Sequence, residues 1–274
     1  MIDFANEYSI DLTRPTSIAI DLDFDGGQPK HFGASPATAT PMIAGEFVGN
    51  TRQGFSCNAD IVTINIHCNG THTETVSHIV DNQVNISSAA MQGFYVACLV
   101  SVVPVVASEC AESYDPCMEP QDLVIGRREL ETALGSFRNR NQDSDALIIR
   151  TLPNPIEKKS YSYGDPIFAP YLSQEAMDWI LDLGVNHLLV DFPSVDRSND
   201  DGRLSNHHRY WNVEQGSRKL SDASRVDKTI TEMIFVPDSI ADGYFALNLQ
   251  VAPFCNNASP SRPILYPLTR IENG

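Results

Sequence analysis

Histidines gather in two short segments of this chain, and this clustering is its clearest chemical signal. Seven histidines occur in 274 residues. Three of them are His67, His72 and His78, and two more form the pair at 207 and 208. Imidazole nitrogens, carboxylate oxygens and thiolate sulfurs are the atoms with which proteins bind zinc and similar ions. The two segments therefore predict a metal or catalytic site.

The first segment places four potential ligand or base groups close together in the sequence. Its local pattern predicts a strand over Ile61–His67 that ends at a turn, Asn69-Gly70. Gly70 can adopt backbone angles closed to other residues, so side chains on both sides of the turn can converge on an ion. The alternative is the polar end of an ordinary hairpin. The four groups are Cys68, His72, Glu74 and His78.

The same segment resembles the hallmark H-x-G-T-H-x-D-x-P-x-H of the cyclase family of metal-dependent hydrolases, which includes kynurenine formamidase and isatin hydrolase. Residues 68–78 read CNGTHTETVSH, so the glycine, the threonine and the last two histidines match in place. Cys68 replaces the first histidine, Glu74 replaces the aspartate and Val76 replaces the proline.

Four further segments are similar to signatures of that family, in the same order along the chain. Ile10–Pro15 looks like the opening I-D-L-S-x-P, and Asp191–Asp196 is similar to an aspartate-threonine-proline-serine segment. The histidine pair is followed by Glu232, and Ala258–Arg262 resembles the closing A-S-P-x-R. The resemblance implies one domain over residues 1–274 with an α/β fold, in which a mixed sheet has the swivelling β/β/α arrangement.

The resemblance also implies a role for each site residue. His207 fits the spacing of the family better than His208 does. His78 stands at the position of the general acid and base, although it could instead orient a ligand. Asp191, Ser194 and Trp211 would form walls of the substrate pocket, whereas buried aromatic residues such as Trp211 pack in cores at least as often. The metal-ligand positions are Cys68, His72, Glu74, His207 and Glu232.

These residue types favour zinc as the metal. A cysteine thiolate is a softer ligand than imidazole and prefers zinc to manganese or magnesium, with manganese as the alternative. A bound ion acidifies water and polarises a carbonyl group. The predicted function is hydrolysis of a small amide, formamide or cyclic amide, of the arylformamidase type. Cyclisation or lactone opening is a second hypothesis, and a metal- or small-molecule-binding protein without turnover is a third.

The elements that must position these residues follow from the apolar patterning. Two helices are predicted, over Arg127–Leu134 and over Gln174–Leu183, the second with Ser173 as its N-cap and Gly184 after its end. The segments Asp23–Gly49 and Arg197–Asp227 are predicted to be long loops that flank the site. Strands are predicted over Ser17–Leu22, Ile61–His67, Phe94–Val103, Ala146–Thr151, His187–Asp191, Thr229–Val236 and Gly243–Val251.

Composition restricts the class of protein. Hydrophobic residues make up 42% of the chain and charged residues 20%, which is typical of a globular fold. The net charge of -16 argues against nucleic acid as a partner. No apolar stretch is long enough to span a bilayer and no export signal is visible, so we expect a cytoplasmic protein whose six cysteines are free thiols. By resemblance we expect a homodimer or homotetramer.

Overall fold

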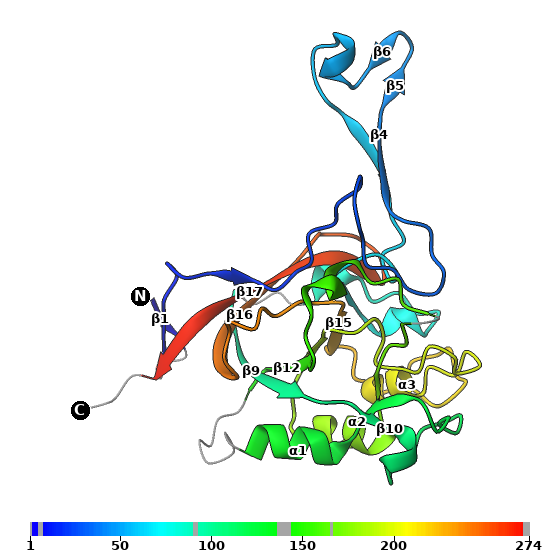
Figure 1. The fold of residues 1–274 in the computed structure, drawn as a ribbon, viewed down its shortest axis with the longest axis vertical. Coiled ribbons are helices and arrows are strands. Elements are labelled where there is room, and N and C mark those ends of the chain that lie inside the picture. Colours follow the sequence, from blue (N-terminus) through cyan, green and yellow to red (C-terminus); the bar gives the residue numbers. More distant parts are fainter. Residues whose placement is uncertain (1, 5–7, 90–92, 136–143, 165–166, 271–274) are drawn as a thin grey trace.

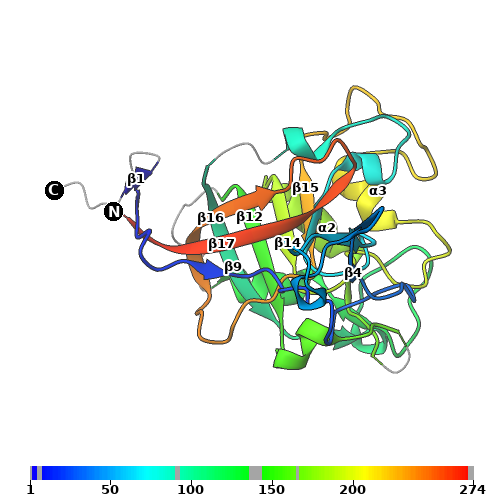
Figure 2. The same ribbon diagram turned by 90° about the horizontal axis from the view of Figure 1, so that it is seen from above.

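The computed structural model describes residues 2–4, 8–89, 93–135, 144–164 and 167–270. One large mixed sheet dominates it, with the strand order β1-β2-β17-β16-β9-β12-β14-β15-β8. The long strand β17 (Ala258–Arg270) pairs with β16 through its middle and with β8 through its first three residues. Because β17 bonds to both, the sheet closes on itself into a barrel-like form, which Figure 2 shows from above.

The remaining elements have the following bounds. The helices are α1 (Arg127–Gly135), α2 (Gln174–Asp182) and α3 (Ser205–Trp211), with 3-10 turns at Thr51–Gln53, Val76–His78, Ile86–Ser88, Ala107–Glu109 and Ile156–Ser160. The other strands are β1 (Ile2–Phe4), β2 (Tyr8–Ile10), β3 (Thr16–Ser17), β4 (Thr38–Pro41), β5 (Ile43–Ala44), β6 (Phe47–Val48), β7 (Asp60–Thr63), β8 (His72–Glu74), β9 (Tyr95–Val102), β10 (Val105–Val106), β11 (Leu123–Ile125), β12 (Ala146–Thr151), β13 (Tyr171–Leu172), β14 (His187–Val190), β15 (Thr229–Glu232) and β16 (Gly243–Val251).

Four neighbouring parallel strands, β9, β12, β14 and β15, form the centre of the sheet. Successive residues of a strand face opposite sides, so Leu147 and Ile149 of β12 pack with the helices while Ala146 and Ile148 pack inside the curved sheet. Helices α1 and α2 lie side by side beneath the outer face (Figure 1). One apolar cluster thus lies between the sheet and the helices and a second lies inside the curved sheet. Together they fix the arrangement of the parallel strands.

Both predicted helices are confirmed. The predicted N-cap of α2 is present, because the Ser173 hydroxyl accepts a hydrogen bond of 2.9 Å from the backbone N–H of Ala176. Gly184 follows the last turn with φ of 77°, a left-handed conformation that favours glycine. Capping chemistry and an apolar face at helical spacing were sufficient to locate α2.

Five predicted strands correspond to β9, β12, β14, β15 and β16, and two predictions are wrong. Ser17–Leu22 contains only the end of β3 and an isolated bridge at Ala19. Ile61–His67 contains only the last three residues of β7, and all four residues of β7 are exposed. The alternation of apolar residues in that segment therefore does not mark a buried face. The ligand-bearing strand is β8, which begins two residues after Gly70.

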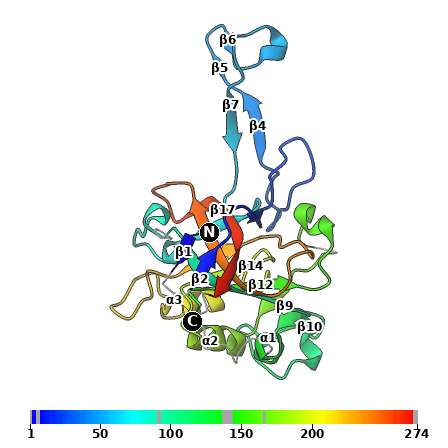
Figure 3. The ribbon, with the colours of Figure 1, turned by 90° about the vertical axis from the view of Figure 1, so that its left-hand side faces the viewer.

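The segment Asp23–Gly49, predicted as a loop, supplies one side of a protruding arm. Strand β4 pairs with β7, and β5 pairs with β6 at the tip. Figures 1 and 3 show this two-stranded arm extending far from the body of the molecule. The arm presents exposed apolar side chains, including Ile43, Ile61 and Val62.

The second predicted loop, Arg197–Asp227, contains the short helix α3. Leu204 before it and Asn212 after it both have positive φ values, 49° and 52°. Helical residues bounded by left-handed conformations give little periodic signal, which explains why the sequence pattern missed them. No helix among the described residues is long and apolar enough to cross a membrane. All six cysteines are free thiols, as predicted.

Candidate metal centre

Two antiparallel neighbours, β8 and β15, bring the acidic and imidazole groups together. Their register places His72 opposite Glu232 and Thr73 opposite Thr231. Side chains opposite one another on adjacent strands lie within direct reach. The strand pairing, which joins residues about 160 positions apart in the chain, is therefore what creates the site.

Glu74 is fully buried and lies at the centre of the cluster. Its Oε2 atom is 2.9 Å from Nδ1 of His67 and 3.9 Å from Nδ1 of His78. Its Oε1 atom is 2.9 Å from Nε2 of His207. The carboxylate thus contacts imidazoles that come from three separate segments, the turn before β8, the turn after it and helix α3.

Glu232 lies at the end of β15, next to the Glu74 cluster. Its Oε2 is 3.4 Å from Nε2 of His72, and its Oε1 is 3.9 Å from Nε2 of His207. The backbone N–H of Val195 donates a hydrogen bond of 3.0 Å to Oε1. Met233, the next residue, has φ of 54°, a strained conformation held by the bond from the Thr71 hydroxyl to its carbonyl. Its neighbours therefore fix the direction of Glu232.

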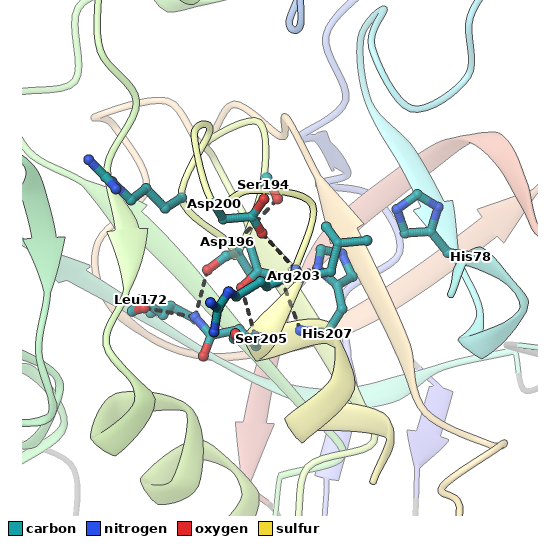
Figure 4. Close-up of polar contacts among 12 residues, drawn as sticks. His78, Leu172, Ser194, Asp196, Asp200, Arg203, Ser205 and His207 are labelled. Carbon is teal, nitrogen blue, oxygen red and sulfur yellow. Dashed lines mark hydrogen bonds and ion pairs between the residues drawn. The ribbon is translucent and has the colours of Figure 1, made fainter. Parts of the chain in front are cut away.

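A buried aspartate orients His207. Asp196 Oδ2 is 2.5 Å from Nδ1 of His207, and its two oxygens accept the backbone N–H groups of Asn206 and His207 at the start of α3. Tyr114 donates a further hydrogen bond of 2.7 Å to the same carboxylate. Figure 4 shows Asp196 above the start of α3, with His78 on a separate segment. Nδ1 of His207 donates to Asp196, which leaves Nε2 directed at the glutamates.

The donor set fits a divalent cation. Nδ1 of His72 lies 3.1 Å from the carbonyl of Gly70 and donates to it, so Nε2 carries a lone pair and faces a carboxylate. Nε2 of His72 is buried without a hydrogen-bond partner and faces Oε2 of Glu232 at 3.4 Å. Acceptors facing each other at short range need a positive charge between them. Ligand atoms of His72, Glu74 and Glu232 lie within 4.8 Å of one another, as do those of His67, Glu74 and His78.

The pKa values show the same shortage of positive charge. Burial acts to raise the pKa of Glu74, but its interactions with His78 and His207, including a hydrogen bond from His207, outweigh it and hold that pKa well below its usual value. Burial and the charge of Glu74 raise the pKa of Glu232. Burial acts to lower the pKa of His207, yet Glu74 and Asp196 raise it well above its ordinary value. The two carboxylates Glu74 and Asp196 thus favour the protonated form of His207.

Cys68, predicted as a ligand, lies in neither of these two groups, whereas His67, which was not predicted, lies in one of them. The backbone N–H groups of Cys68 and Asn69 both bond to the carbonyl of Asn65, and this tight turn separates the directions of residues 67 and 68. Burial and the charge of Glu232 raise the pKa of the Cys68 thiol, which opposes thiolate formation.

The three predicted pocket residues lie behind the cluster. Both oxygens of Asp191 bond to Thr151, and Oδ2 also pairs with the Lys158 ammonium at 2.7 Å. Ser194 accepts a hydrogen bond from the backbone of Asp196. Trp211 is fully buried, donates to the carbonyl of Lys228 and packs against the ring of His207. Asp191 borders an apolar cavity of about 250 Å³, whereas Trp211 and Ser194 support the residues around them.

The cluster opens to solvent on the side of His67 and His78. Their side chains are 25% and 24% exposed, whereas those of Glu74, His207 and Glu232 are at most 4% exposed. The ring of His67 stacks on that of His78 with centroids 4.1 Å apart. His78 also borders a cavity of about 600 Å³ with His208 in its wall. His207 thus faces the carboxylates while its neighbour His208 faces this cavity.

Comparison with known proteins agrees with this architecture. A family model described as "Putative cyclase" matches residues 10–197. The chain belongs to this cyclase family. No curated protein sequence matches the chain.

Solved structures share the cyclase fold at low sequence identity. Isatin hydrolase A from Labrenzia aggregata, bound to benzyl benzoate, has a TM-score of 0.62 at 13% identity, over 92% of this chain and 93% of that one. An isatin hydrolase bound to the product analogue thioisatinate has a TM-score of 0.60 at 9% identity, over 92% of each chain. A predicted metal-dependent hydrolase from Bacillus stearothermophilus has a TM-score of 0.54 at 11% identity, over 92% of this chain and 98% of that one. The predicted α/β cyclase-like fold is confirmed.

Proposed function

We propose that this protein is a metal-dependent hydrolase of C–N bonds that acts on a small amide, formamide or cyclic amide, with aryl formamides as the first substrate class. The observation that carries the proposal is the convergence of buried carboxylates and imidazoles on one point, with the Nε2 atom of His72 left without a hydrogen-bond partner. Several similar structures are of hydrolases, three of them isatin hydrolases, which supports the same class of reaction.

His67, His72, Glu74, His207 and Glu232 would hold the divalent ion. Imidazole ligands suit zinc and carboxylate ligands also suit manganese, and three of these five residues are histidines, so we propose zinc first and manganese second. When bound, the ion supplies Lewis acidity that polarises the substrate carbonyl and acidifies water. Asp196 keeps the Nε2 atom of His207 available as a ligand by holding Nδ1.

His78 is proposed to transfer the proton. Burial lowers the pKa of His78 to about 3, which keeps its imidazole unprotonated near pH 7. It would take a proton from water as the water oxygen bonds to the carbonyl carbon. It would return that proton to the leaving nitrogen as the C–N bond breaks. Its exposed edge and the adjacent cavity give a substrate access to this residue.

The test is a substrate screen on metal-loaded protein. Aryl formamides, isatin and a simple lactone are compared by following formate release or ring opening. We expect turnover of a C–N substrate, and His78→Ala should lower kcat by roughly 10²–10⁴-fold, the usual contribution of a positioned general base. His187→Gln, at a buried histidine outside both ligand groups and outside the cavity beside His78, is the matched control and should retain most activity.

Three results of this screen have distinct meanings. Turnover of the lactone alone would indicate that the protein hydrolyses cyclic esters and not C–N bonds. Metal binding without turnover of any C–N substrate would contradict the proposal and support a binding protein. Equal activity of the His78→Ala variant and the wild type would remove His78 from the mechanism while leaving the reaction class intact.

A further inference from the structure

His31 is a buried histidine that neither the motif nor the proposed mechanism uses. Its residue surface is only 3% exposed. Both ring nitrogens, Nδ1 and Nε2, are buried without a hydrogen-bond partner. Buried polar groups in native proteins almost always have partners, so an imidazole with two free nitrogens requires an explanation.

The backbone around His31 is tied to the metal-binding turn. The N–H of His31 donates to the carbonyl of Cys68 at 3.1 Å, and Lys30 forms a bridge with Asn69. On the other side, the N–H of Lys30 donates to Tyr161 and the carbonyl of Lys30 accepts from Tyr163, each at 2.9 Å. The segment is thus clamped between the turn before β8 and the wall of the apolar cavity that contains Tyr161 and Tyr163.

A strained turn holds the imidazole in this position. Phe32 and Gly33 have φ values of 51° and 64°, and the N–H of Ala34 donates to the carbonyl of His31 at 3.0 Å. These are the features of a type I′ turn, in which a phenylalanine is unfavourable at the first central position. The ring of His31 packs 4.1 Å from that of Phe32 and edge-on to Tyr163. Strain of this kind concentrates at binding and catalytic sites.

The backbone of His31 adjoins the turn that precedes the candidate ligand His72, because its N–H donates to the carbonyl of Cys68. A neutral imidazole always carries one N–H donor. An unpaired, fixed donor beside a metal-binding cluster matches the arrangement that stabilises a developing oxyanion.

We propose that His31 is a substrate-binding residue of the candidate metal centre and that its ring N–H donates a hydrogen bond to the carbonyl oxygen of the amide. This inference rests on the proposed function and adds a residue from outside the metal motif. This hydrogen bond would become stronger as negative charge develops on the carbonyl oxygen in the transition state. Loss of the bond should therefore lower kcat more than it raises KM.

The experiment compares His31→Leu with His31→Gln in metal-loaded protein. Leucine removes two unpaired buried nitrogens, so the folded state should melt at the same or a higher temperature, with unchanged metal content. Removal of one oxyanion donor lowers kcat by roughly 10²–10³-fold in other hydrolases, and we expect a loss of that order with little change in KM. His31→Gln retains an N–H donor and should recover part of the activity. Full kcat in His31→Leu would overturn the proposal.

A second measurement separates this inference from the proposed reaction. Benzohydroxamate, whose carbonyl oxygen binds beside active-site metals, is titrated into the metal-loaded wild type and His31→Leu by calorimetry. We expect at least ~10-fold weaker binding in the variant, as for loss of a buried polar contact. Weaker binding without amide turnover by the wild type would support His31 and contradict the reaction. Equal affinities would contradict the role of His31, and no binding to the wild type would contradict both.

Discussion

At the scale of single residues, the site is defined by which nitrogen of each histidine is free. Gly70 fixes the ring of His72 and Asp196 fixes that of His207, and in both cases Nε2 is left facing a glutamate. Second hydrogen bonds of this type set the tautomer of metal-binding histidines. The motif residues alone therefore do not make the site, because their orientation depends on groups outside the motif.

The exchange of Cys68 for His67 can be tested with cobalt. Cobalt(II) bound by a thiolate gives an intense near-ultraviolet charge-transfer band, whereas histidine and carboxylate ligands give only weaker visible bands. We predict that the cobalt-loaded protein lacks the thiolate band. His67→Ala should bind the metal at least ~10-fold more weakly, whereas Cys68→Ser should bind it as the wild type does. A thiolate band that disappears in Cys68→Ser would return Cys68 to the ligand set.

At the scale of elements, the pairing of β15 with both β14 and β8 joins the parallel core to the strand that carries the motif. At its opposite end, β15 is tied to β14 by a buried histidine. Nδ1 of His187 lies 2.8 Å from the hydroxyl of Thr229, its partner in register. Burial lowers the pKa of His187 to about 4, and the charge of Lys228 contributes. This pair should make the stability of the fold depend on pH.

The sign of that dependence follows from the pKa shift. The unfolded chain binds a proton at the ordinary pKa of 6.5, whereas the folded protein resists it until about pH 4. Stability is therefore full above 6.5 and falls as the pH drops from 6.5 towards 4. Between pH 7 and pH 5 this histidine should account for a loss of about 2 kcal/mol. Urea unfolding should show a correspondingly smaller loss for His187→Gln, and an identical loss in both proteins would refute the assignment.

The sequence predicted the parallel strands and two helices because these are long, apolar and capped. It could not predict β8, which has three residues of mixed polarity and forms because it pairs with β15 and β17.

The site was predicted at the level of the motif, and His72, Glu74, His207 and Glu232 do converge. The sequence could not predict that His67 lies beside Glu74, because this position depends on the turn at Asn65. The role of Asp196 could have been predicted, because this residue ends Asp191–Asp196, a segment that the family resemblance already included.

At the scale of the whole molecule, a two-stranded arm, formed by β4–β7, extends from the body of the protein and leaves several apolar side chains exposed. Ile43, Ile61 and Val62 are 72%, 54% and 52% exposed on this arm. A two-stranded ribbon is marginally stable in isolation, and exposed apolar strands favour further contacts. These features support the proposal that the protein forms a homodimer or larger homo-oligomer through the arm.

Light scattering after gel filtration tests the oligomer. We predict a mass of at least about twice the 30.2 kDa of one chain. The double variant Ile61→Thr/Val62→Thr retains β-branched residues and should shift the protein towards the monomer. Ile156→Thr, at a similarly exposed apolar residue of the body, is the control and should leave the mass unchanged. A monomeric wild type would contradict the proposal.

The central claim, that this fold builds a metal centre, is tested most directly by metal content per chain. Wild type, His72→Ala and the control His208→Ala are purified gently and analysed by elemental mass spectrometry, with thermal melts to verify folding. We predict about one or two equivalents of zinc or manganese in the wild type and the control, and a loss of at least half in folded His72→Ala. A wild type that takes up no divalent metal even after incubation, or a folded His72→Ala that retains all of it, would contradict the account.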